Sequence, residues 1–220
     1  MAWFTDDFNR FFKDLAKHNH KEWFDANRKR YEISVKRPFH DFVLEIIRRV
    51  HTVDKRVHIE PKDAIFRINR DIRFSNDKTP YKLHCAAIVS PEGRKDHGAP
   101  GIYFQLGPEH VAIYGGRYMP ERDEVQRIRE RIAGDLKRFR KLREAPDFVR
   151  LFGEVQGERN KVIPAELKAA AAQEPVLYNK QFYYGHELPA KLVTDPRLAD
   201  IVMEHYHAMR PMNEFLLGKG

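Results

Sequence analysis

Residues 102–114 have the sequence IYFQLGPEHVAIY, which predicts two short strands joined by a tight turn. The strands are expected at Ile102–Leu106 and His110–Tyr114, on either side of Gly107-Pro108, a pair typical of turns. Two further strands are expected upstream, at Ala64–Asn69 and Lys82–Ser90. Short strands with short connections indicate a mostly antiparallel sheet rather than βαβ units.

Helical patterns precede this strand-rich region. Thr5 is a plausible cap for a first helix that ends near Asn19, a second helix is expected over Lys21–Val35, and Pro38 is placed to open a third. In these segments apolar residues recur at steps of three or four, as on one face of a helix. The first fifty residues are therefore predicted to be a helical block.

Helical patterns also follow the strands. They are expected over Pro120–Arg143, over Pro164–Ala172, and from Asp195-Pro196 until Pro211 breaks the helix. Phe182–Tyr184 is expected to be a last strand or extended segment. The sequence thus predicts one α+β domain over residues 1–220, with an antiparallel central sheet flanked by N-terminal and C-terminal helices.

The composition indicates a folded chain with a heavily charged surface. Of the 220 residues 42% are hydrophobic and 33% are charged, against an average of roughly 25% charged. The formal net charge of +8 permits binding to polyanions. Because acidic residues interrupt the basic runs, we expect at most weak, non-specific binding to nucleic acid.

The cysteine count and the lack of long apolar runs bear on location. Cys85 is the single cysteine, so no intramolecular disulfide can form, and it lies in an apolar strand where it should pack as a small hydrophobe. Asp6 and Asp7 argue against a signal peptide, and no apolar run approaches the about 18 residues of a membrane span. We expect a cytoplasmic protein without membrane association, and the sequence implies no cofactor.

The densest polar stretch runs from Arg67 to Lys82. If its backbone is extended, Ile68, Ile72 and Phe74 point into a core while the charged residues point the other way. Arginine forks bind phosphate or carboxylate oxygens, and neighbouring carboxylates can hold the arginines in place. We therefore predict a binding site for a small, phosphate-bearing anion at Arg67, Arg70, Asp71, Arg73, Asp77, Lys78 and Tyr81.

Two alternatives to a simple binding module remain open. The chain could be an enzyme acting on a phosphorylated or nucleotide-like substrate, with Asp71, Asp77 or His84 available as a base, although no catalytic residue can be assigned. It could also be a scaffold or interaction protein whose arginines and aspartates pair only with one another. Arginine heads that face a cleft favour the first two functions, and heads capped by internal carboxylates favour the third.

This polar stretch resembles the signature of the family catalogued as domain of unknown function 2461. The signature is Arg-x-x-Arg-Asp-x-Arg-Phe followed by Asp-Lys-x-x-Tyr, and it falls here on Arg67, Arg70, Asp71, Arg73, Phe74, Asp77, Lys78 and Tyr81. The likeness extends to both ends of the chain, for example to Asn19, Asn27 and Phe215-Leu216. The resemblance implies a one-domain extent and an intracellular setting, and it implies no catalytic residues.

Two other possible sites are less favoured by the sequence. Gly115-Gly116, between a strand and a helix, could present backbone N–H groups to an anion, but acidic residues at the start of the helix would repel one. We expect these glycines to form a turn that ends the sheet. The eleven histidines form no His-Glu-x-x-His pattern, and no metal site is predicted.

Overall fold

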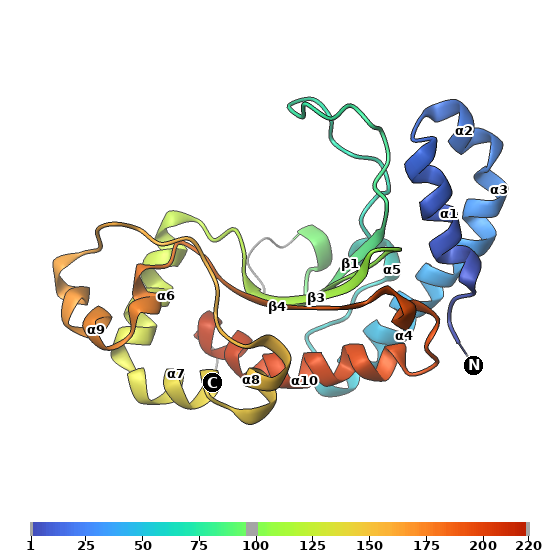
Figure 1. The fold of residues 1–220 in the computed structure, drawn as a ribbon. Coiled ribbons are helices and arrows are strands. Elements are labelled where there is room, and N and C mark those ends of the chain that lie inside the picture. Colours follow the sequence, from blue (N-terminus) through green and yellow to red (C-terminus); the bar gives the residue numbers. More distant parts are fainter. Residues whose placement is uncertain (1, 96–100, 219–220) are drawn as a thin grey trace. The chain divides into compact units, whose positions relative to one another are not determined.

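Among residues 2–95 and 101–218, which the computed structural model describes, four strands form one antiparallel sheet in the order β1-β2-β3-β4 (Figure 1). The strands are β1 (Cys85–Val89), β2 (Ile102–Leu106), β3 (His110–Arg117) and β4 (Phe182–Pro189). Helices precede and follow them along the chain. The predicted α+β class with an antiparallel central sheet is confirmed.

The segments that form the sheet differ from those predicted at both of its edges. Ala64–Asn69 is not a strand, because Ala64 ends helix α5 (Pro61–Ala64) and only Ile65 and Asn69 form isolated bridges. The fourth place belongs to β4, which begins at the predicted Phe182 and continues to Pro189. Each strand pairs with its neighbour in sequence. Residues 107–109 join β2 to β3 by a short turn, whereas residues 118–181, which contain α6 to α9, separate β3 from β4.

The described residues form two compact units. The first comprises residues 2–95, 103–113 and 187–203, and the second comprises residues 101–102, 114–186 and 204–218. That residues 1–220 behave as a single domain stays a prediction, and part of that range, residues 1, 96–100 and 219–220, lies outside the described residues.

The first unit contains the predicted helical block. Its helices are α1 (Asp6–Lys17), α2 (Lys21–Ala26), α3 (Arg28–Tyr31) and α4 (Arg37–Val53). The single helix predicted over Lys21–Val35 is wrong: α2 ends at Ala26, where the Asn27 side chain donates a hydrogen bond to Trp23 O at 2.9 Å and competes with the backbone. A π-helical turn over Glu32–Lys36 then leads into α4, whose first turn contains Pro38 as predicted.

Alternation along β2 separates the core of the first unit from its other face. The Phe104 ring is buried. Its centre lies 5.6 Å from the centre of the Phe42 ring and 6.1 Å from that of the Phe39 ring, both on α4. Successive side chains of a strand point to opposite faces, so Tyr103 and Gln105 lie on the face away from this core, where both are half-buried.

The second unit contains the helices that follow the sheet in sequence. They are α6 (Arg122–Gly134), α7 (Leu136–Arg143), α8 (Pro146–Phe152), α9 (Lys168–Gln173) and the later part of α10 (Leu198–Leu217). The single helix predicted over Pro120–Arg143 is wrong. It is interrupted at Asp135, whose carboxylate accepts a hydrogen bond from the Arg138 N–H at 2.9 Å and so caps the start of α7.

Helix α10 continues through Pro211, which the sequence analysis expected to break it. An interior proline costs about 3 kcal/mol. The side chains of Met209, Met212 and Phe215, on both sides of the proline, are buried, and this burial outweighs the cost. Within the described part of the chain, no helix combines the length and the apolar character needed to cross a bilayer.

Gly115 and Gly116 lie inside β3 and do not end the sheet. A Cβ atom on Gly115 would lie 2.7 Å from Met209 Sδ, and Gly116 has a φ of +83°. Close packing and backbone conformation therefore explain both glycines. The Gly116 N–H donates to Asn213 Oδ1 at 3.0 Å, so this donor is already satisfied within the protein.

Candidate functional site

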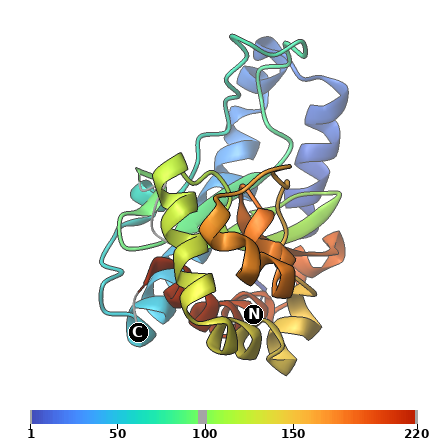
Figure 2. The ribbon, with the colours of Figure 1, turned by 90° about the vertical axis from the view of Figure 1, so that its left-hand side faces the viewer.

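The predicted ligand-binding stretch forms an extended arm, residues 65–84, which joins α5 to β1 and projects away from the strands (Figures 1 and 2). The two sides of the arm are antiparallel and form a bridge between Asn69 and Tyr81. We call residues 70–79 the tip of the arm and the remaining residues its base. This geometry separates the predicted site residues into two groups.

In the tip, Arg70 and Asp77 hold the turn. The Asp77 carboxylate accepts a hydrogen bond from the Thr79 N–H at 2.9 Å, and Arg70 Nη1 donates to Asp77 Oδ2 and to Thr79 Oγ1. The Thr79 N–H and the Arg70 guanidinium lower the pKa of Asp77 to about 2. Arg70 is therefore occupied by internal partners.

The other charged residues of the tip are also paired within it. Arg73 Nη2 lies 2.7 Å from Asp71 Oδ2 and Arg73 Nε lies 3.0 Å from Asp71 Oδ1, a two-point contact that lowers the pKa of Asp71 to about 2. Lys78 Nζ donates to Ile72 O at 3.0 Å. The sequence analysis used the surroundings of the arginine head groups to distinguish a binding protein or enzyme from a scaffold. The guanidinium groups of Arg70 and Arg73 are both capped by carboxylates of the tip, which favours a structural role for these two residues.

The prediction that Phe74 points into a core is wrong, since its side chain is 96% exposed. The backbone turns at residues 73 and 74 instead of continuing extended, so the alternation of inward and outward side chains is lost there. The Arg73 guanidinium carbon lies 5.9 Å from the centre of the Phe74 ring.

Tyr81 anchors the base of the arm through a buried ring. Its ring is 6% exposed and stacks on the ring of Phe24, with centres 4.1 Å apart. The Asn19 side chain accepts a hydrogen bond from the Tyr81 N–H and donates one to the Tyr81 carbonyl. The tyrosine therefore ties the base of the arm to the N-terminal helices.

At the base of the arm, cations lie near the face of the sheet that carries Tyr103 and Gln105, opposite the Phe104 core. Lys82 Nζ lies 5.6 Å from the centre of the Phe66 ring. The centres of the Phe66 ring and of the Tyr103 ring on β2 are 6.0 Å apart. Burial lowers the pKa of the Lys82 ammonium, and the charge of Arg67 lowers it further. Arg67 itself is exposed, and within the described residues no carboxylate forms an ion pair with Arg67 or Lys82.

His84 lies beside this pair of cations and is held neutral. Burial, then the charges of Lys82 and His110, lower the pKa of the His84 imidazole to about 4. A Cβ atom on Gly107 would lie 3.1 Å from His84 Cβ, so the glycine makes room for the histidine. On the same face, His110 Nε2 lies 3.3 Å from Gln105 Nε2.

We call Arg67, Lys82, His84 and His110 the basic cluster. Its members come from the two sides of the arm base and from β3, and none of the interactions found for Lys82 or His84 involves a carboxylate. Mutual repulsion and burial oppose the charging of Lys82 and His84, and a bound anion would relieve that repulsion. Anion binding is therefore the chemistry that this arrangement favours.

The sequence analysis identified only part of this cluster. Arg67 was among the predicted ligand-binding residues, Lys82 lay at the end of the polar stretch, and His84 was named as a possible base. His110 was missed, because its proximity to His84 arises from strand pairing. The alternation along β2, which places Tyr103 and Gln105 opposite Phe104, was the available signal for a polar face.

A metal site and a reactive thiol find no support in the described residues. In that part of the chain, no group of three or more His, Cys, Asp or Glu side chains is arranged to hold a metal ion. Cys85 is buried, as predicted, and its burial raises the pKa of the thiol.

The family model described as "Conserved hypothetical protein (DUF2461)" matches residues 7–215. No curated protein matches the chain. No solved structure matches it either.

Proposed function

We propose that this chain, which belongs to the DUF2461 family of conserved hypothetical proteins, binds a small phosphate-bearing anion at its basic cluster. The observation that supports the proposal is the gathering of Arg67, Lys82 and His84, none of which forms an ion pair with a carboxylate of the described residues. The charge of Arg67 acts on the Asp71 carboxylate of the tip without a direct ion pair. The tip residues Arg70, Asp71, Arg73, Asp77 and Lys78 would shape the arm, and Tyr81 would anchor it.

Electrostatics supports this division between tip and base. The tip cations already have oxygen partners, so a ligand there would have to replace them. At the base, a ligand would meet Arg67 and Lys82, neither of which forms an ion pair with a carboxylate of the described residues. A bound anion should raise the pKa of both Lys82 and His84, because an opposite charge within about 4 to 6 Å favours the charged form. Binding should therefore be accompanied by proton uptake.

The test is thermal unfolding in inorganic phosphate, sugar phosphates and nucleotides, with chloride at equal ionic strength as the control. A ligand at 100 times its Kd should stabilise the protein by about 2.7 kcal/mol. Arg67→Gln and Lys82→Met should each weaken binding about tenfold or more, because each removes a charge-assisted contact. Arg73→Gln is the matched control, since Arg73 is paired with Asp71 in the tip.

Two results would contradict anion binding at the base. One is the absence of any stabilisation by the whole panel. The other is equal stabilisation of the wild type, Arg67→Gln and Lys82→Met. In either case the scaffold function, with a purely structural arginine–aspartate network, becomes the better interpretation.

A second candidate is an enzyme acting on the same anion, and the neutral state of His84 favours it. A pKa of about 4 leaves the imidazole unprotonated at neutral pH. The negative charge of a ligand would raise that pKa toward the range useful for a general base. Turnover of a phosphate-ester panel that is lost in His84→Gln, with binding retained, would support catalysis. Binding without turnover in the wild type would exclude it for those esters.

A further inference from the structure

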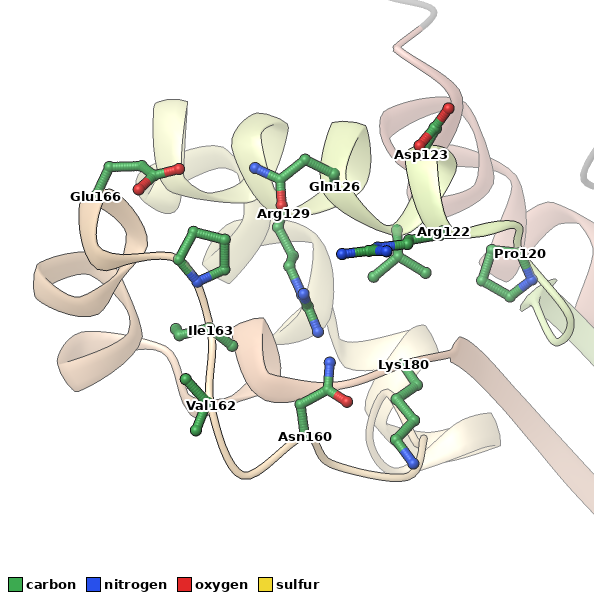
Figure 3. A pocket seen from close by; sticks show the side chains of 12 residues that line it. Pro120, Arg122, Asp123, Gln126, Arg129, Asn160, Val162, Ile163, Glu166 and Lys180 are labelled. Carbon is green, nitrogen blue, oxygen red and sulfur yellow. The ribbon is translucent and has the colours of Figure 1, made fainter.

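A cavity of about 940 Å³ lies in the second unit, between α6 and residues 160–166 (Figure 3). Its volume is near the upper end of the range for small-molecule sites, about 300 to 1,000 Å³. No residue of the arm or of the basic cluster is among those that line it. The cavity is therefore a site separate from the one proposed above.

Arg129 extends from α6 into this cavity and is only 5% exposed. Its Nη2 donates to Asn179 O at 2.9 Å and lies 3.4 Å from Tyr178 O. Its Nε is buried and has no hydrogen-bond partner among the described residues. Burial alone lowers the pKa of this guanidinium, with no contribution from a carboxylate. A buried cation with an unused donor and no counter-charge is rare in a folded protein.

A second arginine faces the same space. Figure 3 shows the Arg122 side chain reaching toward Arg129. No carboxylate of the described residues forms an ion pair with Arg122. Two guanidinium groups around one space suit the oxygens of a carboxylate or phosphate. Lys180, also at the cavity, is less available, because its Nζ lies 3.2 Å from Glu158 Oε2.

The acidic residues of the lining do not neutralise the two arginines. Asp123 and Glu166 line the cavity, but Figure 3 shows the Asp123 side chain turned away from Arg122 and Arg129. Glu166 lies at the end of the cavity opposite Lys180. The space next to Arg129 is therefore bordered by positive charge.

Part of the side of the cavity opposite α6 is apolar. Val162 and Ile163 lie on that side, next to Asn160, and the Val162 side chain is 76% exposed; Pro164 also lines the cavity. An exposed aliphatic side chain beside a cationic centre suits a ligand with both an anionic group and an apolar body. A small inorganic ion would leave this wall uncovered.

We propose that this cavity binds a small organic anion. Its carboxylate or phosphate group would lie between the guanidinium groups of Arg122 and Arg129. Its apolar body would cover Val162 and Pro164. In the sequence, the only indication of this site is that Arg122 and Arg129 are seven residues apart on one predicted helix, a spacing that places them on the same face.

The probes are hexanoate and hexyl phosphate, with inorganic phosphate and hexanol as comparators and chloride at equal ionic strength as the baseline. Calorimetric titration and thermal unfolding should detect binding of at least one of the two amphiphilic anions. In Arg67→Gln, which removes the contribution of the basic cluster, inorganic phosphate and hexanol should each bind at least about tenfold more weakly, because each lacks half of the contacts. Comparing hexanoate with hexyl phosphate shows which anionic group is preferred.

Three variants locate the binding. Arg129→Met and Arg122→Gln should each weaken binding of the amphiphilic anion at least about tenfold. Arg127→Gln is the matched control, because Arg127 is an exposed arginine of the same helix that does not line the cavity. Arg122 is exposed, so Arg122→Gln keeps the test decisive even if Arg129→Met fails to fold.

The proposal is overturned if neither amphiphilic anion binds, if hexanol binds as well as hexanoate, or if Arg122→Gln binds like the wild type. Arg67→Gln and Lys82→Met should leave the binding of hexanoate, which carries no phosphate, unchanged. Loss of binding in those two variants instead would assign the anion to the basic cluster, so the failures of the two proposals can be told apart.

Discussion

Asn19 satisfies both backbone polar groups of Tyr81: its Oδ1 accepts from the Tyr81 N–H at 3.1 Å, and its Nδ2 donates to the Tyr81 carbonyl at 2.9 Å. With the ring of Tyr81 stacked on Phe24, these contacts hold one side of the arm base against the N-terminal helices. Arg67 and Lys82 are positioned on a backbone that is restrained at this point, and a restrained site loses less entropy on binding.

We predict that Asn19→Ala destabilises the protein by about 2 kcal/mol, because two hydrogen bonds of about 1 kcal/mol each are lost to part-buried backbone groups. Urea unfolding measures the change. The matched control is Asn76→Ala in the exposed tip, for which a change within about 0.5 kcal/mol is expected. Equal effects of the two substitutions would show that the Asn19 contacts do not hold the arm.

His84 should make the stability depend on pH in the acid range. Its pKa is about 4 in the folded protein against an ordinary 6.5, so as the pH falls from 6.5 toward 4 the unfolded chain takes up a proton that the folded protein does not. The folded state is therefore destabilised as the pH falls, and the full stability is present above 6.5. Between pH 7 and pH 5 we expect a loss of about 1 to 2 kcal/mol, reduced for the partial exposure of the ring.

Urea unfolding at both pH values, on the wild type and on His84→Gln, tests this dependence. The variant should lose less stability than the wild type on acidification. His207→Gln, which changes an exposed histidine, should behave like the wild type. A pH dependence that is unchanged in His84→Gln would show that the histidine is not held neutral.

We predict that residues 1–220 unfold as one domain although two compact units can be distinguished. The two tryptophans, Trp3 and Trp23, belong to the first unit, so their fluorescence reports on that unit. Far-UV circular dichroism also reports on α6, α7 and α8 of the second unit. Coincident urea transitions from the two probes are expected, and two separated transitions would divide the chain into two domains.

Nucleic-acid binding should be weak and should depend strongly on salt. The net charge of +8 is spread over the surface, and Phe74 alone is too little for a base-stacking platform. Fluorescence anisotropy with labelled duplex and single strands should give at best about micromolar affinity at low salt, lost near 150 mM. Nanomolar affinity at 150 mM salt would place nucleic acid ahead of a small anion as the ligand.

The sequence determined those features that depend on local periodicity. Alternation and turn residues were enough to predict β2, β3 and the antiparallel sheet, and apolar spacing located α1, α4 and most of α6. These signals succeed because the buried face of an element recurs along the chain itself. The polar stretch from Arg67 to Lys82 was found in the same way, as a run of adjacent residues.

The tertiary structure alone decided which charges remain without partners. Arg70 and Arg73 pair inside the tip because the chain turns there, and the same turn leaves Phe74 exposed. The pairing of the strands brings His110 close enough for its charge to lower the pKa of His84, and Arg129 donates a hydrogen bond to the Asn179 carbonyl, 50 positions away. The last two outcomes depend on contacts between residues distant in sequence. The pairs of the tip join residues at most seven positions apart and depend on where the backbone turns, which a pattern of spacing does not encode.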